Sequence, residues 1–378
     1  MKPNPLKQVE ALGQSIWLDY IRRDLITSGE LRRLIEEDGL RGMTSNPAIF
    51  EKAIVASHDY DADIQTMALQ GKSATEVYAA LSQRDVQSAA DEFRALYDKT
   101  DGRDGYVSLE VNPRLAHDTN GTLEEARRLW VALNRPNVFI KVPATDEGLP
   151  AIQQLISEGI NVNVTLLFGL PRYRQVAEAY IAGIEARAGQ GKSVKHVASV
   201  ASFFLSRIDS MVDPLLENLI AQGGKDEAVA KKVHGQVAIA SAKMAFQIYK
   251  ELFICARFKK LTVLGARAQR LLWASTGTKN PAYSDVKYIE ALIGPDTVNT
   301  IPVETLNAFR DHGNPKFRLE QNVAEADWII NELHEMGIRL VQMTQRLENE
   351  GVEKFNLPFD KLMDSLAERV LPQITGKP

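Results

Sequence analysis

One basic residue, Lys141, stands in a run of otherwise apolar residues at 137–143 that is typical of a buried strand. Because alternate residues of a strand share one face, Lys141 points to the same side as Phe139 and away from its aliphatic neighbours. Burial between apolar walls disfavours the charged ammonium and favours the neutral amine, which is a nucleophile. The alternative is a lysine near a strand end whose ammonium reaches water. An enclosed Lys141 would therefore indicate nucleophilic catalysis.

Polar side chains share one face in four further strand-like segments, while aliphatic side chains occupy the other face. If the aliphatic face meets surrounding helices, the polar face lines an enclosed interior. Buried carboxylates and amines are costly unless they are paired, so Asp19, Glu110 and Lys141 together predict a hydrogen-bonded cluster. The alternative for each carboxylate is a strand end in solvent. The polar residues concerned are Asp19, Ser108, Glu110, Asn112, Asn161, Asn163, Thr165 and Ser202.

Short apolar runs alternate with longer segments of helical periodicity, and this alternation predicts βα units and a parallel sheet. Eight such units are most economically a TIM barrel, whose active site is built at the carboxyl ends of the strands. The expected fold class is therefore α/β, a (β/α)8 barrel with additional helices. The predicted strands are Ser15–Tyr20, Leu40–Thr44, Tyr106–Val111, Val138–Val142, Ile160–Leu166, His196–Ser202, Arg270–Ser275 and Val298–Pro302.

The helical segments suggest how the chain is divided. Residues 1–305 would form the catalytic barrel, with a helical insertion at about 47–100, and residues 306–378 a helical C-terminal extension packed on the barrel. An independent second domain is the alternative for that extension. The predicted helices include Ser28–Asp38, Leu123–Leu133 with Thr122 at its start, Gly148–Glu158, Pro171–Ala188 and a long stretch from Met211 to Lys260 that contains Cys255.

Composition argues against several classes of function. The net charge is −4 with interspersed signs, which gives no indication of binding to nucleic acid or to membranes. No secretory h-region and no run of about 18 apolar residues is visible, so the cytoplasm is the expected location. The histidines show no ligand spacing and Cys255 is the single cysteine, so no metal is expected. Glycine-rich nucleotide loops are absent, and no cofactor is expected. A monomer and a homodimer are both compatible with the sequence.

Five segments in chain order resemble the transaldolase family, and the match runs over nearly all of the predicted barrel. Each segment is a weak pattern alone, but all five in order are highly specific. They are Trp17-Leu18-Asp19 in the first strand, Thr44-Ser45-Asn46-Pro47 in the second, Ser108-Leu109-Glu110-Val111 in the third, Phe139 to Thr145 in the fourth and Asn161 to Phe168 in the fifth.

The resemblance implies a cofactor-free transfer of a three-carbon dihydroxyacetone unit from a ketose phosphate to an aldose phosphate. The implied donors are sedoheptulose 7-phosphate and fructose 6-phosphate, and the implied acceptors are glyceraldehyde 3-phosphate and erythrose 4-phosphate, in the non-oxidative pentose phosphate pathway. Lys141 would form the Schiff base and Asp19 would take the proton from the hydroxyl that becomes the departing aldehyde. Glu110 and Thr165 would hold a water that shuttles protons. The residues implied to bind the three-carbon fragment are Asn46 and Asn163.

A phosphate site is implied by two further segments. Ser202 to Arg207 is similar to the family's Ser-x-x-x-x-Arg segment. A family arginine also follows the seventh strand, and here that loop contains Ser275 and has Lys279 where arginine would be expected. Lysine binds phosphate as a point charge and not as a bidentate fork, so the phosphate contacts of this chain differ from the family pattern.

Three alternatives stay open. Fructose-6-phosphate aldolases resemble transaldolases but carry glutamine and tyrosine where this chain has Glu110 and Phe204, so these two residues favour transfer over release. A non-catalytic barrel that binds sugar phosphates would keep the basic residue and the asparagines but would not need the lysine. The alternative for Arg207 is a salt bridge with Asp209 or Asp213.

Overall fold

The computed structural model describes residues 4–375, with side chains to residue 370, and it contains one closed barrel of eight parallel strands in chain order. β8 pairs with β1 and closes the ring, with Gln14 opposite Thr297. The predicted α/β barrel is thereby confirmed. The strands are β1 (Gln14–Asp19), β2 (Gly42–Thr44), β3 (Tyr106–Glu110), β4 (Val138–Pro143), β5 (Val162–Leu167), β6 (Ser199–Phe204), β7 (Arg270–Ala274) and β8 (Thr297–Ile301).

The sixth strand begins later than predicted. β6 starts at Ser199, and His196 lies in an exposed turn before it. The backbone N–H of Ala198 donates to the side-chain oxygen of Asn161 over 2.9 Å, so a side chain takes the place of a strand partner there. The remaining strand ends differ from the prediction by at most two residues, which is the usual uncertainty of element ends.

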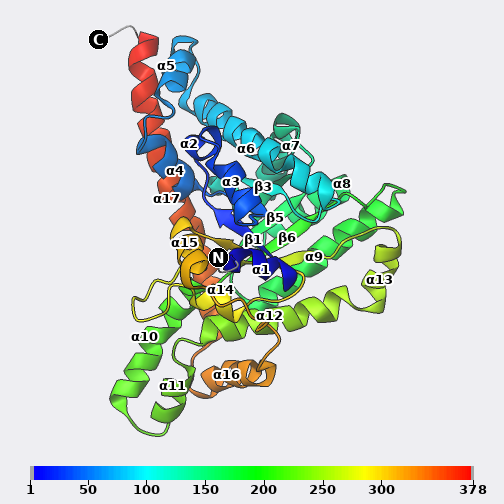
Figure 1. Cartoon of the computed structure of the whole chain (residues 1–378), viewed down its shortest axis with the longest axis vertical. Helices are drawn as coiled ribbons and strands as arrows, with labels where there is room; N and C mark the ends of the chain where they lie inside the picture. Colours follow the sequence, from blue (N-terminus) through cyan, green and yellow to red (C-terminus); the bar gives the residue numbers. More distant parts are fainter. Residues whose placement is uncertain (1–3, 376–378) are drawn as a thin grey trace.

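Helices surround the barrel on all sides (Figure 1). Three of them follow β2, and four follow β6. The helices are α1 (Pro5–Ala11), α2 (Arg23–Thr27), α3 (Glu30–Glu37), α4 (Pro47–Val55), α5 (Asp61–Leu69), α6 (Ala74–Lys99), η1 (Pro113–Leu115), α7 (Thr119–Leu133), α8 (Gly148–Glu158), α9 (Leu170–Gly189), α10 (Ser206–Gln222), α11 (Glu227–Val233), α12 (Val237–Phe253), α13 (Ala256–Val263), α14 (Lys287–Ala291), α15 (Val303–His312), α16 (Val323–Glu335) and α17 (Leu340–Thr375).

Two predicted helix features are wrong. Thr122 does not begin α7, because Asp118 caps the helix by accepting the backbone N–H of Gly121 over 3.0 Å, and Thr122 lies inside the first turns. An aspartate at this position is as good an N-cap as a threonine. Cys255 does not lie inside a helix but at the junction between α12 and α13. The predicted helix over 28–38 is found as α3, and the stretch from 211 to 260 is divided among four helices.

The C-terminal helix α17 passes along the outside of the barrel and over its carboxyl end. It contacts α4, α5 and α6, and it also reaches β5 (Figure 1, red). Gly351 permits this close approach, because a Cβ atom there would lie 3.0 Å from the Leu166 Cδ2 atom of β5. A segment that is remote in sequence from the barrel strands therefore lies against them.

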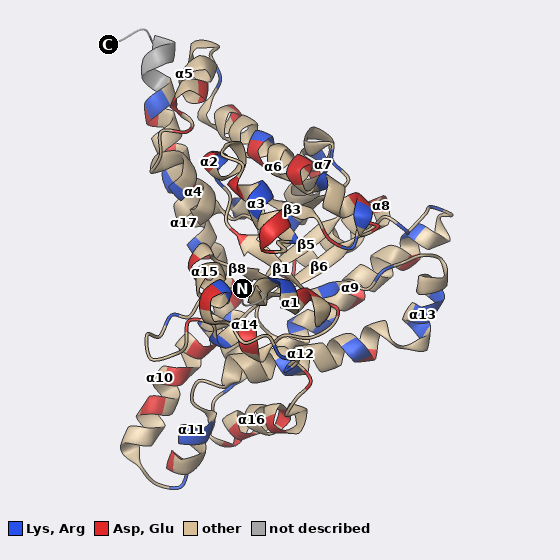
Figure 2. Ribbon diagram, in the orientation of Figure 1, with Lys and Arg blue, Asp and Glu red and all other residues tan. Residues whose placement is uncertain are grey.

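Acidic and basic side chains are interspersed along the helices, and neither sign dominates a face of the ribbon (Figure 2). This distribution agrees with the small net charge of −4. Among the described residues, no helix has both the length and the apolar character needed to cross a membrane.

Candidate active site

A cavity of about 210 Å³ opens at the carboxyl ends of the strands, with further lining from α17. Nearly all the residues singled out from the sequence meet there. Glu110 and Asn163 do not line the cavity, but they flank Lys141 in the strand register, on β3 and β5 respectively. The predicted residues in the lining are Asp19, Asn46, Lys141, Thr165, Ser202, Phe204, Arg207, Ser275 and Lys279.

Lys141 is enclosed, with 4% of its surface exposed, so the solvated alternative is wrong. Its Nζ atom donates a hydrogen bond to the backbone carbonyl of Ser45 over 2.9 Å and lies 3.7 Å from Oε2 of Glu110. The ring of Phe355 lies 5.7 Å from the same Nζ. The amine is thus held at the cavity by a neutral acceptor, and the carboxylate beside it is an ion-pair partner rather than a close hydrogen-bond partner.

Glu110 is a buried carboxyl group beside the lysine. Burial raises its pKa to about 7, and the neighbouring Lys141 ammonium opposes that rise. Neither of its carboxyl oxygens accepts a hydrogen bond from a described protein group, and the hydroxyl of Thr165 is likewise without a partner. A carboxyl group that titrates near neutral pH can both accept and donate protons, which suits acid–base catalysis.

Asp19 lies at the end of β1, on the other side of the cavity floor. Its Oδ1 atom accepts a hydrogen bond from the hydroxyl of Thr44 over 2.7 Å, and the same hydroxyl lies 2.7 Å from that of Thr300. Burial raises the pKa of Asp19 above its usual range, while Lys141 opposes the rise. Asp19 is therefore a better base than a solvated aspartate, and a threonine pair holds its orientation.

Both predicted asparagines form hydrogen bonds within the protein, but only Asn46 keeps a side-chain group free for a ligand. Asn46 caps α4, and its side-chain oxygen accepts the backbone N–H of Ile49 over 3.0 Å, which leaves its amide nitrogen for a ligand. Asn163 is fully buried and links two hydroxyls, because it accepts from Ser202 over 2.7 Å and donates to Ser108 over 3.1 Å. Asn163 therefore positions Ser202, which lines the cavity.

Arg207 points into the cavity and has no ion pair within 4 Å among the described residues. The salt bridges considered from the sequence are not formed. Asp209 instead accepts the Lys287 ammonium over 3.1 Å, and Asp213 accepts the hydroxyl of Tyr283 over 2.6 Å. Burial lowers the pKa of Arg207 from its usual value. A half-buried guanidinium without a carboxylate partner is suited to an anionic ligand.

The loop after β7, the neighbour of β6 in the barrel, carries Lys279 to the cavity lining. It starts at Ser275, which has a left-handed backbone (φ 54°) and whose hydroxyl lies 2.9 Å from that of Ser206. The hydrogen bond from Tyr283 to Asp213 ties the far part of the loop to α10. The longer loop is thus attached at both ends, and Lys279 lies between the two attachments.

Sequence reasoning missed the contribution of α17. Lys354 and Phe355 both line the cavity, and Phe355 covers the amine of Lys141. No local pattern distinguishes these two residues from other positions of an amphipathic helix. Their role follows only from the path of α17 across the barrel.

No cluster of histidine, cysteine or carboxylate side chains that could hold a metal ion occurs among the described residues. The cavity lining offers instead the amines of Lys141, Lys279 and Lys354, the carboxyl group of Asp19, amide and hydroxyl groups and the guanidinium of Arg207. The carboxyl group of Glu110 lies beside Lys141. An enclosed lysine between two carboxyl groups at the carboxyl end of a (β/α)8 barrel is an arrangement that suits an enzyme with an amine nucleophile.

Comparison with known proteins specifies the family. The sequence matches the family described as Transaldolase/Fructose-6-phosphate aldolase over residues 16–366. It is 49% identical over 375 residues to the transaldolase of Trichodesmium erythraeum and 47% identical over 375 residues to transaldolase 2 of Nostoc punctiforme, with 98% of each chain covered in both cases. It is 44% identical over 366 residues to the transaldolase of Saccharopolyspora erythraea, with 97% of each chain covered.

The chain belongs to the transaldolase family. Its function is accordingly that of a transferase, and the similarity over the full length implies sugar-phosphate substrates.

Proposed function

We propose that this chain transfers a dihydroxyacetone unit between sugar phosphates through a Schiff base on Lys141. The proposal is supported above all by the Lys141 amine, which is buried at the cavity and lies 3.7 Å from the Glu110 carboxylate. The amine attacks the ketose carbonyl, water leaves, and a protonated imine forms. When the carbon–carbon bond breaks, its electron pair moves toward the imine and an aldose leaves as the aldehyde. The same steps in reverse, on a second aldehyde, complete the transfer.

The two carboxyl groups divide the proton transfers between them. Asp19 takes the proton from the hydroxyl that becomes the departing aldehyde, and its raised pKa supports this role. Glu110 and Thr165 hold the water that carries protons while the imine forms and hydrolyses. Support for that role comes from their oxygens, which are buried and lack a protein partner. Asn46 then binds the three-carbon fragment directly, and Asn163 helps to fix its pose by holding the Ser202 hydroxyl at the cavity.

A product assay tests transfer against simple release. Fructose 6-phosphate supplied with erythrose 4-phosphate should give sedoheptulose 7-phosphate, and little free dihydroxyacetone should appear when the acceptor is omitted. Glu110 and Phe204 support this expectation, because the resembling aldolases carry other residues there. Rapid release of dihydroxyacetone without acceptor would instead make the chain an aldolase.

Arg207→Ala should raise KM for phosphorylated sugars by about 10- to 100-fold while kcat changes little. The reason is that Arg207 is the unpaired guanidinium of the cavity and is proposed to grip the substrate phosphate together with Lys279. Steady-state kinetics with fructose 6-phosphate provide the measurement.

Two companion variants sharpen that result. Arg207→Lys should have a KM between those of wild type and Arg207→Ala, because lysine keeps the positive charge but cannot form two parallel hydrogen bonds to the phosphate. Arg174→Ala removes an arginine of the outer surface, paired there with Glu251, and should leave KM unchanged. An unaltered KM in Arg207→Ala would show that Arg207 does not bind the substrate phosphate.

Glu110→Gln should remove an inflection near pH 7 from the profile of kcat against pH and lower kcat by about 100-fold. Burial raises the pKa of Glu110 to about 7, so its protonation state changes across the working range. Glu353→Gln, an exposed position on α17, is the matched control and should keep the wild-type profile. An inflection that persists in Glu110→Gln belongs to another group.

The same carboxyl group has a predictable effect on stability. Because the folded-state pKa of Glu110 is raised from 4.5 to about 7, the native state binds this proton more tightly than the unfolded chain does. The resulting stabilisation is present below the unfolded pKa and is lost as the pH rises through about 7. Urea denaturation measures the free energy of unfolding at about pH 5 and about pH 8. The decrease in this free energy between the two pH values should be smaller in Glu110→Gln than in wild type.

The division of the chain belongs to this proposal as well. Residues 1–305 would form the catalytic barrel with the insertion at about 47–100, and residues 306–378 an extension whose α17 closes the cavity mouth. Lys354 and Phe355 in the cavity lining support that assignment. The cytoplasm is the proposed location, as the sequence predicts.

A further inference from the structure

Basic side chains gather at the active-site cavity, and one of them comes from α17. Besides the lysine of the Schiff base, the lining holds Arg207 at the start of α10, Lys279 in the loop after β7 and Lys354. α10 and α17 contact each other. Among the described residues, the same lining holds one carboxyl group, on Asp19. An anionic group of a bound substrate therefore meets an excess of positive charge from three separate elements.

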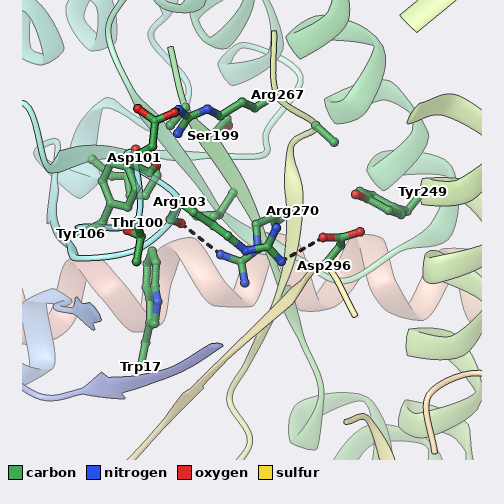
Figure 3. A pocket seen from close by; sticks show the side chains of 15 residues that line it. Trp17, Thr100, Asp101, Arg103, Tyr106, Ser199, Tyr249, Arg267, Arg270 and Asp296 are labelled. Carbon is green, nitrogen blue, oxygen red and sulfur yellow. Dashed lines mark hydrogen bonds and ion pairs between the residues drawn. The ribbon is translucent and has the colours of Figure 1, made fainter. Parts of the chain in front are cut away.

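The arginines at the opposite end of the barrel differ, because each already has a counter-charge. They line a hollow at the amino ends of the strands. Arg103 pairs there with Asp296 at 2.9 Å (Figure 3), and Arg267 and Arg270 each pair with an aspartate, at 3.2 Å and 3.0 Å. Arg207 has no such partner among the described residues. Positive charge is thus left for a ligand anion at the active site and not at the opposite end.

Lys354 is held at the cavity by an exposed ion pair within its own helix. Its Nζ atom donates to Oε2 of Glu350, one helical turn earlier, over 3.1 Å. The two side chains are 50% and 32% exposed. Ion pairs of this spacing on an exposed helix surface contribute little to stability. The Lys354 ammonium can therefore exchange the singly charged Glu350 for a phosphate group.

The charge of Glu350 also acts on Arg207. Burial lowers the pKa of the Arg207 guanidinium, and the Glu350 carboxylate opposes that fall. Glu350 therefore competes with a substrate phosphate for both basic groups. It also accepts a hydrogen bond from Nε of Arg346 over 2.7 Å, and Arg346 is exposed and outside the cavity lining. Glu350 thus keeps a partner when Lys354 turns to a ligand.

A structural role would explain the contact between Lys354 and Glu350 but not its position. The other lysine of α17, Lys361, pairs with Glu51 of α4 at 2.5 Å and does not line the cavity. Lys354 instead precedes Phe355, whose ring lies 5.7 Å from the Nζ atom of the Schiff-base lysine. The part of α17 that covers the reactive amine is therefore also the part that brings an ammonium group to the cavity.

We propose that Lys354 binds the phosphate group of the sugar substrates together with Arg207 and Lys279, and that Glu350 holds Lys354 at the cavity until the phosphate arrives. The inference rests on the proposed function, because it assigns a further residue to the substrate of that reaction. An arginine at position 279 would offer the phosphate two parallel hydrogen bonds. This chain offers two single ammonium groups from two elements instead. Lys354 is a binding residue and takes no part in the bond-making steps.

Steady-state kinetics of three variants test the assignment, with glyceraldehyde as an uncharged acceptor so that only the donor carries phosphate. Lys354→Gln should raise KM for fructose 6-phosphate by about tenfold with kcat nearly unchanged, and it should leave kcat/KM for fructose as in wild type. Glu350→Gln frees the ammonium and should lower KM for fructose 6-phosphate by about threefold. Lys361→Gln removes the same charge from the same helix outside the cavity and should keep the wild-type KM.

A ligand without a carbonyl group separates this test from that of the proposed function. Sorbitol 6-phosphate cannot form an imine, and calorimetric titration should give a Kd about tenfold higher in Lys354→Gln than in wild type. Borohydride should still trap saturating fructose 6-phosphate on Lys141 in the same variant. If trapping fails in wild type, the proposed function fails, while the difference in Kd still upholds the role of Lys354.

Three results would overturn the inference. Wild-type Kd and KM values in Lys354→Gln would show that Lys354 does not bind the phosphate, even where trapping at Lys141 succeeds. Equal losses with fructose and with fructose 6-phosphate would assign Lys354 a structural role. A wild-type KM in Glu350→Gln would show that Glu350 does not compete with the phosphate.

Discussion

Lys141→Met is expected to lower kcat/KM for transfer by about 1,000-fold or more, equivalent to about 4 kcal/mol of barrier. Methionine has nearly the length of lysine but no nucleophilic nitrogen, so neither imine nor carbanion can form. The fold should survive, because Lys141 is surrounded by buried side chains that tolerate an apolar group of similar size. Loss of the ammonium also leaves burial to raise the pKa of Glu110 without opposition, which keeps that carboxyl group neutral.

Borohydride reduction in the presence of fructose 6-phosphate separates the loss of chemistry from the loss of fold. The wild-type chain should gain a permanent adduct, and peptide mass analysis should locate it at Lys141. Lys141→Met should gain none, with a circular dichroism spectrum like that of wild type. Lys354→Met, which removes another lysine of the cavity lining, should still be trapped. A label on any other lysine would contradict the proposed mechanism.

Asp19→Asn is expected to lower kcat by about 100- to 10,000-fold while imine formation continues. Asparagine has the same shape, and its side-chain oxygen can still accept the hydrogen bond from Thr44. It cannot, however, take the proton that must leave before the carbon–carbon bond breaks. The variant should therefore accumulate the imine, and borohydride should trap at least as much adduct as in wild type.

Thr44→Val provides the graded comparison for Asp19→Asn. It removes the 2.7 Å hydrogen bond to the carboxylate but leaves the base in place, so kcat should fall far less. Asp98→Asn, at an exposed position of α6, is the control and should leave kcat unchanged. Equal loss of trapping and of turnover in Asp19→Asn would show that Asp19 acts before the cleavage step.

Much of the barrel and of its reactive groups could be predicted because strand geometry links sequence parity to position. In a closed barrel, alternate residues of each strand face the interior, so Lys141, Glu110 and Asp19 had to point inward together. The parallel order of the strands then placed their carboxyl ends at one face. Helix ends were less predictable, as Thr122 and Cys255 show, because neighbouring capping residues compete for the same role.

The sequence by itself determined the kind of fold, the inward-facing reactive residues and the family resemblance, since these depend on local periodicity and on motifs within single strands. Only the tertiary structure decided that Lys141 bonds to a backbone carbonyl and that α17 brings Phe355 over the amine. It also decided that Arg207 lines the cavity without a carboxylate partner among the described residues. These features depend on contacts between segments far apart in the chain, and no local pattern encodes such contacts.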